Sequence, residues 1–168
     1  MWNLAVIVYY SHILQDNQKT RAQPLCLRKG IKMYEYTRPV YYYETDKMGV
    51  VHHSNYLRWL EETRISFFND NDLAYAETES YGVLSPITEV NVKFIFPARF
   101  GDIFTVKMQM IKYTGVRFTV EYTVINQNGD LLLQGKSSHA FINRDFKPVS
   151  LSREIPKRHE LMKKLIKP

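Results

Sequence analysis

The sequence predicts an α+β fold in which one curved antiparallel sheet wraps around a single long helix. One helix-like run, residues 54–68, follows a first strand-like run and precedes four others. Apolar residues occupy most of the circumference of that helix, so it is expected to be buried on nearly every side. The strand patterns alternate between apolar and polar residues, which indicates a sheet with one buried face. Such a sheet can cover such a helix by curving around it.

The first two elements are predicted from residue type. Residues 36–44 are mostly β-branched or aromatic, and Pro39 restricts this strand to an edge or a bulge. Residues 54–68 begin at Ser54, a good N-cap residue, and contain no Gly or Pro. The apolar residues of the helix are Tyr56, Leu57, Trp59, Leu60, Ile65, Phe67 and Phe68. One edge strand and one buried helix are therefore expected in this order.

Four further strand patterns follow a polar loop at residues 69–80. They cover residues 90–96, 104–110, 116–124 and 131–142. Asn128-Gly129 predicts a tight hairpin between the last two, so the later strands are expected to form an antiparallel meander. Residues 155–166, with Pro156 near their start, predict a short amphipathic helix that packs on the body. The order βαββββ, with a short C-terminal helix, is that of the hotdog fold.

Length, charge and cysteine content limit the possible classes of protein. The 168 residues suit one domain, residues 33–152, followed by a basic helix and tail at 153–168. Residues 1–32 are predicted to be an N-terminal extension, or translated sequence upstream of a true start at Met33. The net charge of +6 resides in the two ends, which argues against a nucleic-acid partner, and no apolar run reaches membrane-spanning length. The single cysteine, Cys26, excludes an intrachain disulfide and suits a cytoplasmic protein.

The segment from Asp46 to Gly49 connects the first strand to the helix and has two interpretations. An acid and a glycine three residues apart are good turn formers. The acid also lies close to the positive end of the buried helix, where backbone N–H groups are unpaired. A thioester needs donors aimed at its developing oxyanion and a carboxylate that attacks it or deprotonates a water. Asp46 is the candidate carboxylate, and the turn and the reaction centre both remain possible.

Residues 38–64 resemble the hallmark segment of the 4-hydroxybenzoyl-CoA thioesterase family. That pattern runs acid-x-x-Gly-(Val/Ile)-Val-x-(His/Tyr)-x-x-Tyr, followed by an acid and a basic residue on the helix. Residues 97–102 are similar to the family's Pro-Ala-x-x-x-Asp turn, and the likeness extends over about residues 36–150. The resemblance implies an acyl-CoA thioesterase without a cofactor, with coenzyme A as part of the substrate. It also implies dimers paired into tetramers, with sites at the subunit interfaces.

The resemblance assigns roles to individual residues. Asp46 matches the catalytic carboxylate, as nucleophile or general base. His53 matches the His/Tyr position that would hydrogen-bond or orient the thioester. Gly49 and Val50 match the turn that brings the backbone close to the substrate, and Tyr56 matches the last tyrosine of the pattern, also expected near the substrate.

Further substrate contacts are expected outside this segment. The family's other carbonyl-polarising amide would fall near Leu84 or Ser85. Lys112 and Arg117 flank a strand turn and could meet the phosphates of coenzyme A, although surface bases of this kind more often face solvent.

The helix and its start hold three more residues of interest. Glu61 and Arg64 can pair, and on a mostly buried helix a structural ion pair, or support of the catalytic groups, is expected rather than chemistry. His52 departs from the family, in which an aromatic residue is common at this position. Adjacent side chains of an extended backbone point to opposite faces, so His52 and His53 are not expected to share a role or a metal, and no metal site is predicted.

Hydrolysis of an acyl-CoA is thus the leading prediction, with two alternatives. Hotdog hydratases and dehydratases show Asp-x-x-x-x-His, or a His followed by Phe-Pro-Gly, whereas here six residues separate Asp46 from His53. A non-catalytic acyl-CoA-binding protein would be expected to lack the carboxylate. The acyl group stays open, because Tyr and Phe fill both cores and pockets.

Overall fold

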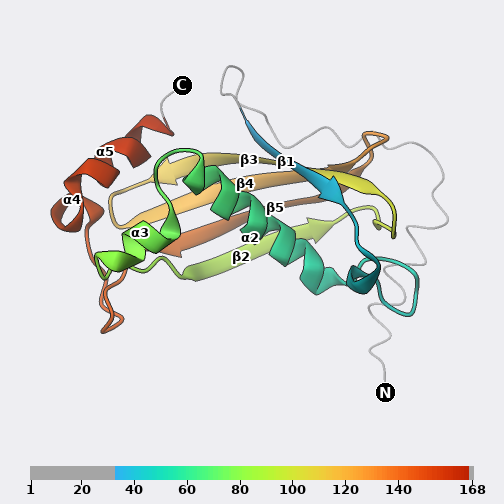
Figure 1. The fold of residues 1–168 in the computed structure, drawn as a ribbon, viewed down its shortest axis with the longest axis horizontal. Helices are drawn as coiled ribbons and strands as arrows, with labels where there is room; N and C mark the ends of the chain where they lie inside the picture. Colours follow the sequence, from blue (N-terminus) through green and yellow to red (C-terminus); the bar gives the residue numbers. More distant parts are fainter. Residues whose placement is uncertain (1–32, 167–168) are drawn as a thin grey trace.

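Five antiparallel strands form one sheet in the computed structural model, which describes residues 33–166 (Figure 1). The strand order is β1-β3-β4-β5-β2, so β1 and β2 are the two edges. The strands are β1 (Tyr34–Pro39), β2 (Ile87–Phe94), β3 (Ile103–Tyr113), β4 (Arg117–Asn126) and β5 (Leu131–Ala140).

The long helix α2 (His53–Asn69) crosses one face of this sheet (Figure 1). Its Trp59 is fully buried and stacks on Phe104 of β3, with ring centroids 3.9 Å apart and planes 10° from parallel. Alternate residues of β3 and β4 face the helix and complete the core: Phe104, Val106, Met108, Met110, Phe118, Val120, Tyr122 and Val124. The predicted α+β architecture is therefore confirmed.

The prediction that α2 is buried on nearly every side is wrong for the single chain. Leu57 and Ile65 are 40% and 41% exposed. The sheet covers one side of the helix only, so these two residues lie on the side that it leaves uncovered. The N-cap also lies two residues earlier than expected, at His52 rather than Ser54.

The first strand is shorter than predicted. It ends at Pro39, opposite Ile103 of β3, and a single 3-10 turn, η1 (Tyr42–Glu44), takes up the rest of the run. Pro39 has no N–H with which to continue a ladder, and Tyr41 N donates instead to the side chain of Glu44. The aromatic run therefore bends toward α2 instead of lengthening the sheet.

The meander prediction is correct for β3, β4 and β5 and wrong for β2. Although β2 precedes β3 in the chain, it pairs with β5 at the far edge. Alternation of residue types shows which side of a strand is buried but not which strand lies beside it. As an edge strand β2 is poorly covered, and Val90 is 39% exposed.

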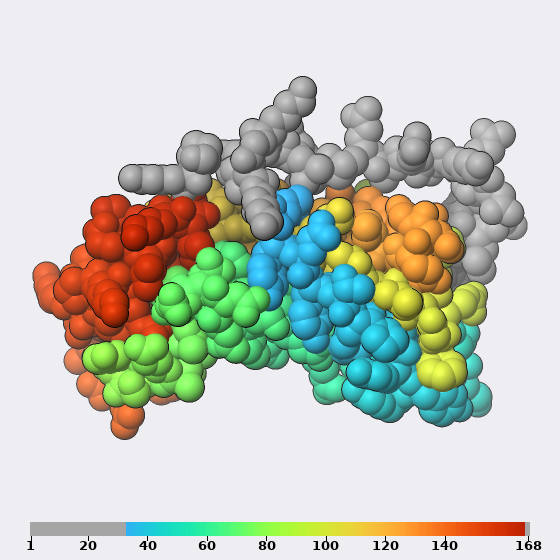
Figure 2. Space-filling model, turned by 45° about the horizontal axis from the view of Figure 1, so that its top comes forward, coloured from blue at the N-terminus to red at the C-terminus, as the bar shows by residue number. Residues whose placement is uncertain are grey.

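Short helices gather at one end of the sheet. The polar loop contains α3 (Tyr75–Ser80), and the chain ends in α4 (Leu151–Glu154) and α5 (Pro156–Lys164). Figure 2 shows the red C-terminal helices against green α3 at one end, and the segment near residue 45 beside the yellow segment near residue 100 at the other. Within residues 33–166, no helix is both long and apolar enough to cross a membrane. The expectations for residues 1–32 lie outside the described part.

Candidate active site

Asp46 begins a tight turn that is closed at its base by backbone hydrogen bonds. Asp46 N donates to Val50 O at 2.9 Å, and Thr45 and Val51 form an antiparallel bridge below that pair. Gly49 adopts φ +72°, a left-handed conformation that favours glycine, and its N–H donates to Asp46 O at 2.9 Å. Asp46 is thus held in a fixed hairpin-like turn, as one of the two interpretations predicted.

The side chain of Asp46 is oriented by the same turn. Its Oδ1 accepts a 2.8 Å hydrogen bond from Met48 N. The residue is half-buried, so the carboxylate is anchored on one side and accessible on the other. The carboxylate therefore already has a defined orientation before a substrate binds.

The first turn of α2 is attached to the base of this loop. The carbonyl oxygen of Glu44 accepts from His52 N at 2.9 Å and from Asn55 Nδ2 at 2.7 Å. The last residue before the turn is thereby joined to the residues that start the helix. The N–H groups at a helix start carry a partial positive charge that favours a developing oxyanion.

Glu44 is a residue that sequence reasoning missed. Its side chain is 3% exposed, yet it carries a carboxylate that accepts from Arg38 Nη2 at 2.7 Å, Trp59 Nε1 at 2.7 Å and Tyr41 N at 2.8 Å. Burial alone would raise the pKa of this carboxyl, but the hydrogen bonds from Arg38, Trp59 and Tyr41 outweigh burial and lower it. The available signal was a lone acid at the end of an aromatic run, six residues after an arginine.

Arg38 of β1 joins the buried Glu44 to Glu62, which is partly exposed. Besides Glu44 it contacts Glu62 of α2 through Nε at 2.8 Å. Burial opposes its charge, but the hydrogen bonds from its guanidinium to Glu44 and Glu62 raise its pKa above the ordinary arginine value. We call Arg38, Glu44, Trp59 and Glu62 the Glu44 cluster.

The two histidines lie side by side, contrary to expectation. Their ring centroids are 4.1 Å apart with planes 37° apart. His52 is the N-cap and His53 the first helical residue, so the backbone is no longer extended across the pair and the opposite-face rule does not apply. His52 Nδ1 lies 2.9 Å from Ser54 Oγ and 3.4 Å from Ser54 N, which gives His52 a capping role. Among residues 33–166, no group of three His, Cys, Asp or Glu side chains could hold a metal.

Tyr56 and Val50, two of the predicted substrate contacts, are buried in the single chain and are not exposed to a ligand. Tyr56 is 3% exposed, and its hydroxyl accepts from Ala98 N at 2.9 Å. Val51 N donates to Ala98 O at 2.8 Å, so the β2–β3 connection is attached to both the helix and the turn. Arg99, which sequence reasoning also missed, places Nη1 4.0 Å from where a Cβ on Gly49 would stand. A cation therefore lies next to the turn.

The remaining predicted substrate contacts lie at the opposite end of the sheet. Leu84 pairs with Ile142, and Lys112 and Arg117 flank the β3–β4 turn. Strand β3 begins beside the Asp46 turn and is 11 residues long, so its other end, at that far turn, lies about 35 Å away. Within one chain these positions, and Ser85 beside Leu84, are therefore not brought together with Asp46.

The predicted ion pair between Arg64 and Glu61 is long, with 3.8 Å between Nη2 and Oε1. The closer contacts of Arg64 are with hydroxyl groups. Its Nε donates to Tyr75 Oη at 3.0 Å and its Nη1 to Tyr122 Oη at 3.3 Å. Arg64 thus belongs to a buried hydroxyl cluster under α2, and the pair with Glu61 is the weaker contact.

That cluster extends to a fully buried histidine. Tyr122 Oη lies 3.0 Å from Ser137 Oγ, which lies 2.8 Å from His139 Nε2. Burial first, and then the positive charge of Arg64, lower the pKa of His139 to about 4, against an opposing hydrogen bond with the Ser85 backbone. His139 is therefore neutral at physiological pH.

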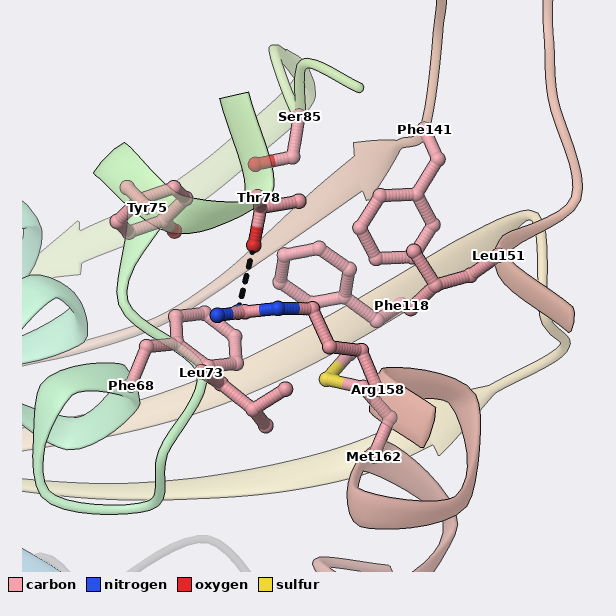
Figure 3. Close-up of a pocket in the computed structure, with 10 residues that line it drawn as sticks. All are labelled: Phe68, Leu73, Tyr75, Thr78, Ser85, Phe118, Phe141, Leu151, Arg158 and Met162. Carbon is pink, nitrogen blue, oxygen red and sulfur yellow. Dashed lines mark hydrogen bonds between the residues drawn. The ribbon is translucent and has the colours of Figure 1, made fainter. Parts of the chain in front are cut away.

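A small pocket between α3 and the C-terminal helices occupies the same end as Ser85 (Figure 3). Its water-accessible volume is about 20 Å³, room for one or two waters. Arg158, 3% exposed, crosses this pocket and donates through Nη1 to Thr78 Oγ1 at 2.8 Å, and it also pairs with Glu77. The lining is otherwise mostly apolar: Phe68, Leu73, Tyr75, Ser85, Phe118, Phe141, Leu151 and Met162.

Comparison with known proteins defines the class of this chain. The Thioesterase-like superfamily matches residues 40–161, and the chain belongs to it. Its hotdog fold is shared with a solved DHNA-CoA thioesterase from Staphylococcus aureus, at a TM-score of 0.75 and 33% identity over 79% of this chain and 89% of that one.

Two relatives refine this placement. A protein of Bacillus subtilis (strain 168) named "Putative acyl-CoA thioesterase YneP" is 33% identical over 126 residues, 74% of this chain and 91% of the relative. A 1,4-dihydroxy-2-naphthoyl-CoA hydrolase of Thermosynechococcus vestitus is 31% identical over 62% of this chain and 73% of the relative. The resemblance is confirmed for the superfamily, whereas the narrower 4-hydroxybenzoyl-CoA family is not, because these relatives have other names.

Proposed function

We propose that this protein hydrolyses acyl-CoA thioesters to a free carboxylic acid and coenzyme A. The observation that carries the proposal is the placement of Asp46. Its carboxylate lies on a closed turn whose base is hydrogen-bonded to the start of the long buried helix, in a chain whose relatives are named acyl-CoA thioesterases. The chain is a thioester hydrolase, and the residue roles below are part of the proposal.

Asp46 supplies the reacting carboxylate. It either attacks the thioester carbonyl carbon, with water then releasing the acid, or takes a proton from a water that attacks the same carbon. Backbone N–H groups at the start of α2 stabilise the oxyanion of the tetrahedral intermediate, and the thiolate of coenzyme A leaves as it collapses. His53, exposed at the first helical position, orients the thioester beside them.

The active site is completed by a second copy of the chain. One edge of β2 has no neighbouring strand within residues 33–166, and Val90 of this strand is 39% exposed. Two β2 strands that pair antiparallel about a two-fold axis place the start of one beside the end of the other. Ser85 lies just before β2, and the Asp46 turn is hydrogen-bonded to the connection that follows β2, through Val51 N and Ala98 O. Leu84 and Ser85 of one copy therefore approach Asp46 of the other. This accounts for the long separation of these sites within one chain.

The acyl group is the open part of the substrate. The relatives' names point both to acyl-CoA in general and to an aromatic acyl group, 1,4-dihydroxy-2-naphthoyl-CoA. A panel of 1,4-dihydroxy-2-naphthoyl, benzoyl, short aliphatic and long aliphatic CoA thioesters, assayed by thiol release, identifies the preferred class. The cytoplasm is the proposed location of the reaction.

The deciding experiment compares wild type with Asp46→Asn on the best substrate of that panel. We expect steady-state thiol release to be abolished, at least ~10³-fold, while the oligomer measured by light scattering is unchanged. Full activity in the variant contradicts the role of Asp46. An enoyl-CoA followed for hydration in the same assay separates a hydratase, and substrate binding without turnover in the wild type indicates a non-catalytic acyl-CoA-binding protein.

Assembly is tested by a single charge on the open edge. Val90→Lys is expected to shift the protein toward the monomer and to lower activity in parallel, since a lysine on an edge strand opposes pairing. Ala76→Lys, on the exposed side of α3, is the matched control and should leave the mass unchanged. A wild-type chain that is monomeric and active rejects the shared site.

A further inference from the structure

We propose that the Glu44 cluster is a positioning device that sets the distance between Asp46 and the start of α2. The inference rests on the proposed function, since it assigns Glu44, Arg38 and Trp59 a part in the same reaction. Each acts through the turn and the helix and not on the substrate itself.

The side chain of Glu44 is fixed from three elements at once. Arg38 reaches it from β1, Trp59 from α2 and the N–H of Tyr41 from the start of η1, all at 2.7–2.8 Å. Trp59 is itself fixed by its stack on Phe104 of β3. The position of the carboxylate therefore depends on how the sheet and the helix lie relative to each other.

The backbone of the same residue fixes the reacting end. The carbonyl oxygen of Glu44 accepts from His52 N and Asn55 Nδ2, at the first turn of α2. One residue later the Thr45–Val51 bridge begins, and the residue after that is Asp46. A shift of Glu44 is thus transmitted to Asp46 and to the helix start together.

A role confined to stability would not require this chemistry. A buried ion pair gains little net stability over well-packed apolar side chains, because desolvation of both charges opposes the Coulomb attraction. A site that must hold a carboxylate within a fraction of an ångström of its working position gains from supporting groups that are themselves locked. Glu44 provides such support, because both carboxylate oxygens and the backbone carbonyl of this one residue accept hydrogen bonds.

The test uses the full-length chain and compares Glu44→Gln with Glu121→Gln. Glutamine keeps the shape of Glu44 but removes its charge and one of the two oxygens that accept from Arg38, Trp59 and Tyr41. Glu121 is a matched control, since it is 8% exposed and pairs with Lys136 at 3.0 Å, but on the face of β4 that points away from α2. For both variants kcat and KM are measured on the preferred acyl-CoA, and hydrogen exchange is followed in a peptide covering residues 43–56.

We expect Glu44→Gln to lower kcat by at least about 10-fold with KM changed by less than about two-fold, because misplacement of a reacting group affects the chemical step. Exchange in residues 43–56 should accelerate, and Glu121→Gln should change neither quantity. Trp59→Phe, which removes one donor and keeps the stacked ring, should give a smaller loss of kcat and keeps the test valid if Glu44→Gln does not fold.

Three results overturn the proposal: wild-type kcat and exchange in folded Glu44→Gln, a raised KM with unchanged kcat, or an equal loss of kcat in Glu121→Gln. A wild-type protein that releases no thiol from any acyl-CoA rejects the proposed function instead. The exchange measurement, which needs no substrate, then decides alone whether Glu44 holds the turn.

Discussion

The indole Nε1 of Trp59 donates a 2.7 Å hydrogen bond to the carboxylate of Glu44, and both side chains are buried. Trp59 belongs to the middle of α2, whereas Glu44 ends the turn that leads to Asp46. This bond therefore joins the most buried part of the core to the candidate active site. Changes in the core should reach the site by this route.

Trp59→Phe should destabilise the protein by about 1–3 kcal/mol, because a buried acceptor loses one of its donors. The phenylalanine ring can still pack on Phe104, so the loss should lie below that of a full truncation. Urea unfolding followed by circular dichroism gives the free energy of unfolding. Trp59→Leu, which loses both the bond and the ring, should cost more; a smaller cost for Leu would contradict this assignment.

Arg38→Met should destabilise the protein by about 3 kcal/mol at pH 7, because it leaves the Glu44 carboxylate buried beside no cation. Arg38 helps to lower the pKa of Glu44, so in the variant this pKa rises. A carboxyl with a lowered pKa adds stability above its unfolded pKa and loses it as the pH falls through the folded value. The difference between wild type and Arg38→Met should thus shrink as the pH falls from 7 to 4, measured by urea unfolding at each pH.

The sequence predicted the parts of the fold that depend on local patterns. The helix was recognisable because residues 54–68 hold no Gly or Pro, and the β4–β5 hairpin because of Asn128-Gly129. The place of β2 beside β5 was not predictable, since alternation does not name a partner. The Glu44 cluster was missed because its members lie up to 24 residues apart on three elements, and only the folded chain brings them within 3 Å of one another. Asp46 and His53 were predicted through a motif and their roles stay predictions, but the capping role of His52 depends on where the helix begins.

His139 should make stability depend on pH above the range in which carboxylates titrate. Its pKa of about 4 in the folded protein lies below the ordinary value of 6.5, so the unfolded chain binds a proton that the folded chain excludes. The contribution of neutral His139 to the free energy of unfolding is then fully present above pH 6.5. It is lost as the pH drops toward 4, by about 2–4 kcal/mol in total. Urea unfolding between pH 7.5 and 4.5 measures the slope, and His139→Gln should flatten it. An unchanged slope in that variant would exclude His139 as the cause.

Gly135→Ala should loosen β2. An added Cβ would stand 2.6 Å from Val92 Cγ1 and 2.8 Å from Asn91 O, and the second contact is to backbone that cannot turn away. We expect a loss of about 1–3 kcal/mol and faster amide exchange in β2. Ser138→Ala, on the same strand, is the control and should cost much less. If the shared site is correct, Gly135→Ala should also weaken the dimer.

The two adjacent histidines should separate stability from rate. His52→Ala removes the N-cap and should cost about 0.5–1 kcal/mol of stability. His53→Ala should lower kcat about 10- to 100-fold, less than Asp46→Asn, with little change in stability. Thermal unfolding and steady-state kinetics on both variants check the pair, and an exchange of the two effects would reverse the assignment.

In the turn that holds Asp46, the groups that fix the carboxylate are separate from the side chains exposed at the tip. Backbone hydrogen bonds, the Thr45–Val51 bridge and the Asp46 side chain hold its shape, whereas the side chains of Lys47 and Met48 lie exposed at its tip. New side chains at positions 47 and 48 can therefore be introduced without moving the carboxylate. The identity of these two side chains is thus free to vary, in evolution or in engineered variants, while the carboxylate keeps its position.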